Sequence, residues 1–251
     1  MIRIACIICL ITLLWCFTSC KDDHEIILPE PVYSSVNDIE GNTYQTVRIG
    51  DHWWMAENLK TTRYRDGTVI PTEADDTKWW QLRTDAYCWY ENNLDFKAKY
   101  GALYNGYAVQ TGKLCPSGWH VPTYPEWKTM VRYLVDNGYG HKGSGNDIAK
   151  ALAAKTDWKS YSMTGTPGND PASNNSSGFS AFPGGMRDFD GIFNYANHFG
   201  FWWSSTQAGD YPLLGTFTAI YLKLDFCEKE PLINETGYLA LAGLSVRCIK
   251  D

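Results

Sequence analysis

The stretch Cys115–Trp127, CPSGWHVPTYPEW, brings a cysteine, a histidine and a glutamate close together, the residue types of a nucleophilic catalytic site. The spacing of its other residues favours a different interpretation. Thr123 and Glu126 fit a capping box, in which the threonine begins a helix and the glutamate bonds back to the threonine N–H. We therefore expect this stretch to start a helix, with His120 packed and hydrogen-bonded as a structural residue.

Carboxylates of the second half are the next candidates for chemistry. Asp188, Asp190, Asp225 and Glu228 lie in loop-rich sequence, where two of them could act as acid and base on a glycosidic bond. Turn chemistry explains these residues without catalysis, and we favour solvated loop charges. The segment RDFDGIFN is like the first half of a calcium loop but lacks the later ligands. We expect no metal site and no cofactor, with calcium left open.

Other signatures of enzymes are missing from the chain. It contains no G-x-S-x-G, H-E-x-x-H or P-loop pattern, and no C-x-x-C after Cys20. No residue is therefore assigned a catalytic role, and we expect a protein that is not an enzyme.

Composition limits the class of protein further. The chain has 251 residues, of which 44% are hydrophobic and 15% aromatic, enough for a core and for an aromatic ligand surface. The formal net charge is −6 and the basic residues do not cluster. Binding to nucleic acid, which requires clustered positive charge, is therefore not expected.

The first residues predict export and lipidation. Residues 1–19 combine Arg3 with an apolar run that is too short to span a bilayer, which is typical of a signal peptide. Cys20 follows Phe17-Thr18-Ser19, a sequence similar to a bacterial lipobox, so we predict that Cys20 is lipidated.

Localisation follows from the residues after Cys20. Lys21-Asp22-Asp23 resembles the short charged signal that directs some bacterial lipoproteins to the outer face of the outer membrane. Residues 20–36 carry prolines and no helical period, so they are expected to form a tether. Residues 37–251 are expected to form a single domain, anchored to the membrane by lipid and facing the cell exterior.

Periodicity predicts an α+β domain, with two helices packed on short antiparallel β-sheets and long loops. Turn residues inside Asp38–Leu59 indicate a hairpin. A second helix is expected from Asp147 to about Lys155, and strands from Phe179 onward. Of the adjacent Trp202 and Trp203, we expect one to face the core and one to face outward. The first helix has one apolar stripe, formed by Trp127, Met130, Val131, Leu134 and Val135.

Several ordered motifs together resemble one known family. They are DIEGNTYQTVRIGDHWWMAENLKTTRYRDGTVIP, AYCWYENN, YGALYNGYAV, CPSGWHVPTYPEWKTMVRYL, SGFSAFPGGMRD, FWWSST and SVRCIKD. From Val36 to Asp251 the chain is similar to the Fibrobacter succinogenes major paralogous domain family, within the C-type-lectin-like superfamily. The resemblance implies a C-type-lectin-like fold. Cys227 and the apolar segment after Thr206 depart from the pattern.

The resemblance also implies a disulfide and a function. Cys115 and Cys248 occupy the places of a bridge between the first helix and the last strand, and Cys88–Cys227 then follows by elimination. The implied function is a binding module for a glycan or protein ligand, with its binding face in the late loops. Candidate contacts, chosen by residue type and region, are Arg187, Asp188, Tyr195, His198, Tyr211, Asp225 and Glu228.

Two alternatives stay open. The segments VPTYPEWK and SVRCIK are similar to parts of formylglycine-generating enzymes, but that chemistry needs two closely spaced cysteines near the end of the domain. The other alternative is a structural surface or adhesin component that binds no small ligand.

Overall fold

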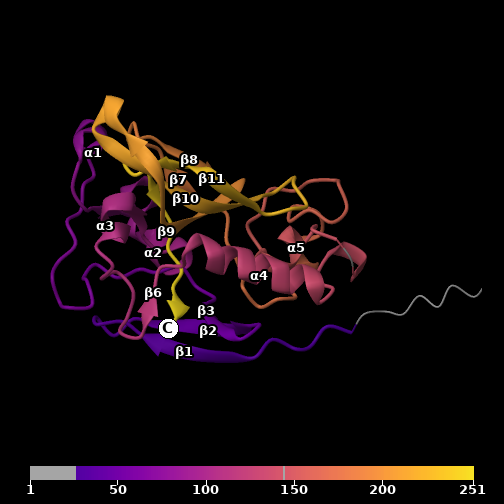
Figure 1. Ribbon diagram of the computed structural model, residues 1–251. Helices are drawn as coiled ribbons and strands as arrows, with labels where there is room; N and C mark the ends of the chain where they lie inside the picture. Colours follow the sequence, from indigo (N-terminus) through magenta and orange to yellow (C-terminus); the bar gives the residue numbers. More distant parts are fainter. Residues whose placement is uncertain (1–26, 144) are drawn as a thin grey trace, which may run out of the picture.

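Two β-sheets with a helix between them form the core of the protein (Figure 1). A computed structural model describes residues 27–143 and 145–251. The architecture is mixed α+β, as expected, with most of the regular structure in the sheets. The predicted signal peptide, Cys20 and Lys21-Asp22-Asp23 lie outside the described residues.

The strands vary from short pairs to one long hairpin. They are β1 (Tyr33–Asn37), β2 (Thr43–Ile49), β3 (His52–Met55), β4 (Tyr87–Cys88), β5 (Leu103–Asn105), β6 (Trp119–His120), β7 (Gly184–Arg187), β8 (Phe193–Ala196), β9 (Phe199–Tyr211), β10 (Thr216–Asp225), β11 (Leu232–Leu239), β12 (Gly243–Leu244) and β13 (Ile249–Lys250). β9 and β10 form the long hairpin, because they pair from Thr216–Tyr211 to Asp225–Phe199.

Only one helix is long. The α-helices are α1 (Asp76–Gln81), α2 (Lys97–Tyr100), α3 (Gly106–Gln110), α4 (Tyr124–Asp136) and α5 (Ala149–Leu152). The single-turn 3-10 helices are η1 (Tyr90–Asn92), η2 (Leu94–Phe96), η3 (His141–Gly143), η4 (Pro171–Ser173) and η5 (Pro212–Leu214).

The smaller sheet has the strand order β1-β2-β3-β13-β6. The predicted hairpin is confirmed as β2–β3, in which Val47 pairs with Trp54. The tether prediction was too long, because residues 33–36 belong to β1 and pair with β2. The Val36 side chain packs against the hydrophobic core, which explains why this segment forms a strand and not a tether.

Helix α4 begins as its sequence predicts and packs against both sheets (Figure 1). The Thr123 side chain accepts from the Glu126 N–H, and the Glu126 carboxylate accepts from the Thr123 N–H, which completes the capping box. Trp127 is fully buried, and its ring packs against that of Trp54 in a tilted arrangement with the centroids 5.0 Å apart. The second predicted helix was too long: α5 has no side-chain cap, and Ala153 is already extended and bridges to Ala181.

The larger sheet has the order β11-β10-β9-β7-β12-β5-β4, with β8 paired to β7. Its interior strand β9 carries Trp202 and Trp203 on opposite faces, and both side chains are 0% exposed. The expectation that one of them faces outward was wrong, because the sheet has a hydrophobic core on each side. Trp202 packs in the core that contains Trp127, and Trp203 packs in the core that contains Tyr104.

The polar loop that follows α5 is organised around one lysine. The Lys150 ammonium donates to the Asn169 carbonyl, to the Asp170 carbonyl at 2.8 Å and to the Asn174 side-chain oxygen at 2.8 Å. Asn174 in turn donates to the Ala154 and Pro167 carbonyls. This network ties the loop back to α5, beside the sheet.

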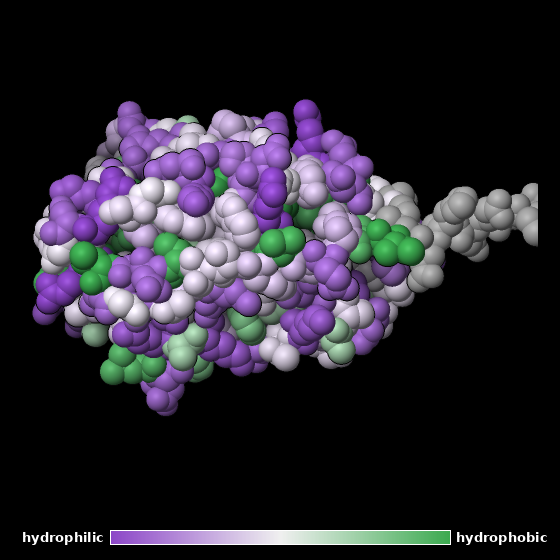
Figure 2. Space-filling view, turned by 90° about the horizontal axis from the view of Figure 1, so that it is seen from below, coloured by the Kyte–Doolittle hydropathy of each residue, from purple (hydrophilic) through white to green (hydrophobic). Residues whose placement is uncertain are grey.

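The face beneath β1–β3 has the character of a solvated surface. Seen from below, hydrophobic residues form separate patches among hydrophilic ones (Figure 2). Patches of this kind do not call for a partner protein. In the described part of the chain, no helix has the length and apolar character that crossing a membrane requires.

Candidate ligand-binding surface

A continuous row of aromatic side chains crosses the large sheet and its flanking loops. Neighbouring rings in the row have centroids 4.9 to 6.5 Å apart, in tilted or edge-on contact. We call this set the aromatic row. In spatial order it consists of Trp80, Phe189, Tyr238, Tyr221, Phe201, Tyr195, Phe199, His198, Phe226 and Tyr161.

The register of the sheet explains why the row forms. Alternate residues of β9, Phe199, Phe201 and Trp203, lie on one face of the strand. Tyr221 of β10 pairs with Trp203, so its ring joins the same face. Phe201 and Tyr221 are 6% and 7% exposed, whereas Tyr195 is 47% exposed. The row therefore extends from the core to the surface.

Tyr195 holds its ring at the surface in a strained conformation. Its φ is 69°, in the left-handed region that a bulky residue rarely adopts. The following turn is tight, because the His198 N–H donates to the Tyr195 carbonyl at 3.0 Å and Asn197 also has a positive φ. The Tyr195 ring lies 4.9 Å from Phe199. Backbone strain of this kind is concentrated at functional sites.

Charged groups border the exposed end of the row. The Lys223 ammonium lies 4.8 Å from the Phe199 ring centroid and 3.3 Å from an Asp225 oxygen. The Lys159 ammonium lies 5.4 Å from the Phe226 centroid. Rings next to such charges can bind a ligand through its apolar faces and through its polar groups.

At the other end of the row, Tyr238 and Asp188 form a polar contact. The Tyr238 hydroxyl donates to Asp188 at 3.0 Å. Burial and the negative charge of Asp188 both raise the pKa of Tyr238. The hydroxyl therefore stays protonated and keeps this donor role. Asp188 also accepts from the Phe189 N–H, so its carboxylate is committed to the turn that precedes β8.

Comparison with known proteins places the domain in a family. Residues 47–250 match the model of the Fibrobacter succinogenes major domain. The chain belongs to this family. No curated protein and no solved structure matches the chain significantly.

In this Fibrobacter succinogenes major domain, Arg187 is not a ligand contact. The side chain is 0% exposed, and its guanidinium donates to carbonyls of Glu73, Ala74 and Gly191 and to the Asp76 carboxylate at 2.7 Å. Arg187 therefore fastens the segment around α1 to β7. Three of its four partners, Glu73, Ala74 and Asp76, lie far away in the sequence, which is why its role could not be inferred from residue type.

Of the other predicted contacts, Asp225 is largely enclosed and Tyr211 lies elsewhere. Asp225 is 7% exposed, and its oxygens contact Lys223 and the backbone N–H and thiol of Cys227. Tyr211 is 41% exposed but lies at the far end of β9 from Phe199, roughly 40 Å along an extended strand. Tyr195 and His198 come together in the row, and Glu228 is exposed just beyond β10.

Several row residues were not among the sequence candidates. They are Trp80, Tyr161, Phe189, Phe199, Phe201, Tyr221, Phe226 and Tyr238, with Lys159 and Lys223 beside them. The alternation of Phe199 and Phe201 along β9 was the one available signal, because it places both rings on a single face.

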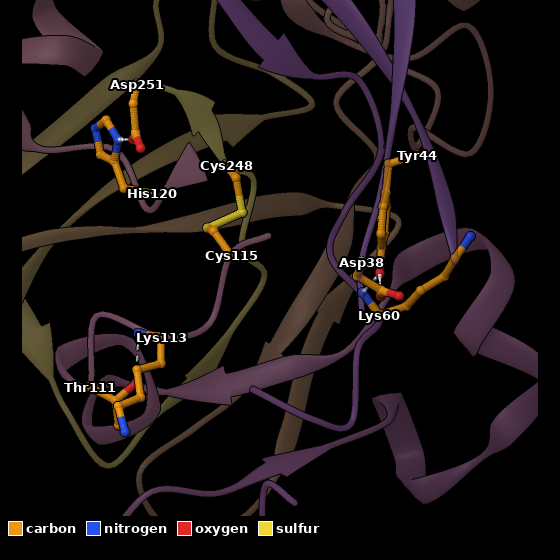
Figure 3. The surroundings of a disulfide bond; sticks show 9 residues. All are labelled: Asp38, Tyr44, Lys60, Thr111, Lys113, Cys115, His120, Cys248 and Asp251. Carbon is orange, nitrogen blue, oxygen red and sulfur yellow. Dashed lines mark hydrogen bonds and ion pairs between the residues drawn. A yellow bond between two sulfur atoms is a disulfide. The ribbon is translucent and has the colours of Figure 1, made fainter. Parts of the chain in front are cut away.

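The family domain contains the predicted Cys115–Cys248 disulfide, which joins residues 133 positions apart (Figure 3). The predicted Cys88–Cys227 bridge was wrong, because both cysteines are free. Cys88 is buried beside Arg187, and burial raises its pKa to about 12. Cys227 lies in the turn after β10, where burial and hydrogen bonding to Asp225 raise its pKa to about 11. Elimination failed because these two cysteines belong to different parts of the fold.

His120 is structural, as expected from the sequence (Figure 3). Its Nε2 lies 2.9 Å from Glu126 and its Nδ1 lies 2.6 Å from Asp251. Burial lowers the pKa of His120, but the hydrogen bonds to Asp251 and Glu126 outweigh it and raise the pKa above 6.5. The imidazolium thus links β6, α4 and the residue after β13. In the described part of the chain, no group of three or more His, Cys, Asp or Glu residues could hold a metal ion.

Proposed function

We propose that this protein is a lipid-anchored, surface-exposed outer-membrane lipoprotein whose single domain is a non-enzymatic binding module with a C-type-lectin-like fold. The signal peptide and Cys20 support the anchor. The capped helix and the bridge from Cys115 to Cys248 support the lectin-like fold. A likeness of fold does not by itself define a ligand, so the ligand is argued from the surface.

The observation that carries the proposal is the exposed end of the aromatic row. Tyr195 is held outward by a left-handed backbone, and Phe199 packs beside it with Lys223 over its ring. Aromatic rings next to hydrogen-bonding and charged groups suit the apolar face and hydroxyls of a sugar. A glycan is therefore the ligand that we favour, with a protein ligand as the second candidate.

The test is a binding screen of the full chain against glycans and host proteins, with and without calcium. We expect Tyr195→Ala and Phe199→Ala to weaken binding by about 1–2 kcal/mol each. The Tyr195 change should leave the melting temperature nearly unchanged, because that ring is exposed. Tyr211→Ala, at the far end of β9, is the matched control and should bind normally. Loss of binding in the Tyr211 variant alone would move the binding face away from the row.

The same preparation tests the alternatives. Consumption of a thiol peptide together with oxygen, or hydrolysis of a polysaccharide, would favour an enzyme. Failure to bind any glycan or protein would favour a structural surface component.

A further inference from the structure

His198 has its proton position defined by its two neighbours. Its Nδ1 lies 3.0 Å from the Ala196 carbonyl oxygen, and its Nε2 lies 3.1 Å from the Lys159 ammonium. A carbonyl only accepts hydrogen bonds and an ammonium only donates them. Nδ1 therefore carries the hydrogen and Nε2 accepts from Lys159. The imidazole is neutral in this arrangement.

Lys159 is held against this imidazole without a carboxylate partner. Its backbone N–H donates to the Asn197 carbonyl at 2.7 Å, which fixes the residue beside the β8–β9 turn. Among the described residues, the ion pairs within 4.0 Å use other lysines, Lys99, Lys113 and Lys223. An ammonium that faces a histidine and no described carboxylate is available to an anion from outside.

The surroundings of this pair are open and aromatic. The contact between Lys159 and His198 is solvent-exposed. The His198 ring lies 5.3 Å from Phe226 and 6.4 Å from Phe199, and each of these rings has a lysine ammonium over it. A ligand that stacks on the end of the row thus meets positive charge at its edge.

Further ionisable groups lie on the elements packed against His198. They are Tyr195 on the same turn, Tyr161 on the loop, and Lys223, Asp225, Cys227 and Glu228 at the end of β10 and after it. Asp225 is engaged by Lys223 and Cys227. Among the described carboxylates, none lies within 4.0 Å of the His198 ring nitrogens.

We propose that Lys159 and His198 form a receptor for an anionic oxygen group, a carboxylate or a sulfate, on an acidic glycan bound at the aromatic row. This inference rests on the proposed function and names the class of ligand. The anion pairs with the Lys159 ammonium, and His198 takes one proton from solvent at Nε2 and donates it to the anion. Without an anion, that proton would face the ammonium directly, which like-charge repulsion opposes.

Proton uptake on binding has a definite sign. The complex holds one more proton than the free protein, so affinity for the acidic ligand rises as the pH falls. A neutral glycan makes no use of this proton, and its affinity should not follow the pH in this way. The two ligand classes are therefore distinguished by pH as well as by affinity.

The experiment uses the full chain and paired glycan probes, each a uronic-acid or sulfated oligomer and its neutral methyl-esterified or desulfated counterpart. We expect the acidic member to bind about tenfold more tightly than the neutral one at about pH 5.5, with a smaller advantage at about pH 8. Lys159→Met should remove this advantage. His198→Asn should keep binding but remove its pH dependence. Lys128→Met, which removes a lysine on α4, is the matched control.

The outcomes separate this inference from the proposed function. Equal binding of acidic and neutral probes that is lost in Tyr195→Ala would overturn the receptor and leave the aromatic row in place. An acidic preference that persists in Lys159→Met would assign the anion to another site. Binding of protein ligands alone, with no glycan bound, would overturn the receptor as well.

Discussion

Trp202 and Trp203 are neighbours in the sequence, yet their rings lie in two different cores of the protein. The Trp202 indole N–H donates to Asn58 at 2.9 Å, and the Trp203 indole N–H donates to the Tyr104 carbonyl at 2.7 Å. Both rings are fully buried. The large sheet is thus covered on both faces at β9, and each core depends on one of the two indoles.

Replacing either tryptophan should destabilise the whole domain. We expect Trp202→Ala and Trp203→Ala each to lower the free energy of unfolding by about 3–5 kcal/mol, because each empties a large core position. Tyr211→Ala, an exposed position on the same strand, should change it by less than about 0.5 kcal/mol. Chemical denaturation followed by tryptophan fluorescence measures these changes. A small effect at Trp203 would mean that its side of the sheet is not a true core.

The disulfide should contribute strongly to stability. Replacing Cys115 and Cys248 together by alanine should lower the free energy of unfolding by about 5 kcal/mol, since the bridge closes a loop of 133 positions. Non-reducing peptide mapping should recover these two cysteines in one linked peptide. An alkylating reagent should modify half-buried Cys227 in the folded protein only slowly, because its raised pKa leaves little thiolate, and should modify buried Cys88 only after unfolding. Any linked peptide that contains Cys88 would contradict this assignment.

The pH dependence of stability should reflect His120 and Glu126. The pKa of His120 is raised above 6.5 in the folded protein, so its contribution is complete below that pH and is lost as the pH rises through the folded value. Burial raises the pKa of Glu126, but hydrogen bonds from Thr123 and His120 lower it below 4.5 overall. That contribution is present above pH 4.5 and is lost as the pH falls through the folded value.

These shifts can be measured directly. Thermal unfolding across the pH range should show His120→Gln losing the decline in stability on the alkaline side while keeping the decline on the acid side. Glu126→Gln should weaken both, because it removes a partner of His120 and part of the helix cap. A His120→Gln variant with an unchanged alkaline profile would show that another group titrates there.

The proposed membrane attachment rests on Cys20, which lies outside the described residues. Cys20→Ala should abolish labelling by a fatty-acid probe and release the protein from the membrane. Replacing Lys21-Asp22-Asp23 by alanines should preserve labelling but remove accessibility to external protease. Persistent labelling of the Cys20 variant would disprove lipidation at this residue. Unchanged protease accessibility of the second variant would disprove a surface-localisation signal at Lys21-Asp22-Asp23.

Local signals in the sequence predicted local structure well. The capping box at Thr123, the stripe that contains Trp127 and the β2–β3 hairpin all depend on residues close together in the chain. The disulfide was implied by family resemblance, and the structure confirms it. Predicting each of these features requires little knowledge of the rest of the fold.

Features made by distant segments could not be predicted in this way. Burial of Arg187 requires carbonyls of Glu73 and Ala74, and burial of both tryptophans requires a second core. The aromatic row depends on the pairing of β9 with β10 and on the contact of the β8 ring of Tyr195 with rings of β9, because rings from each element make it continuous. Residue type alone therefore selected Tyr195 and His198 but missed Phe199.

Lys150 gives the long polar loop a property that a bound ion could not provide. The ammonium that gathers Asn169, Asp170 and Asn174 is covalently part of the chain, so it neither dissociates nor competes with ions in the medium. A chelator cannot remove the positive charge from this position, and dilution of the protein does not release it. The anchoring of this loop by Lys150 therefore does not depend on divalent cations in the surrounding fluid.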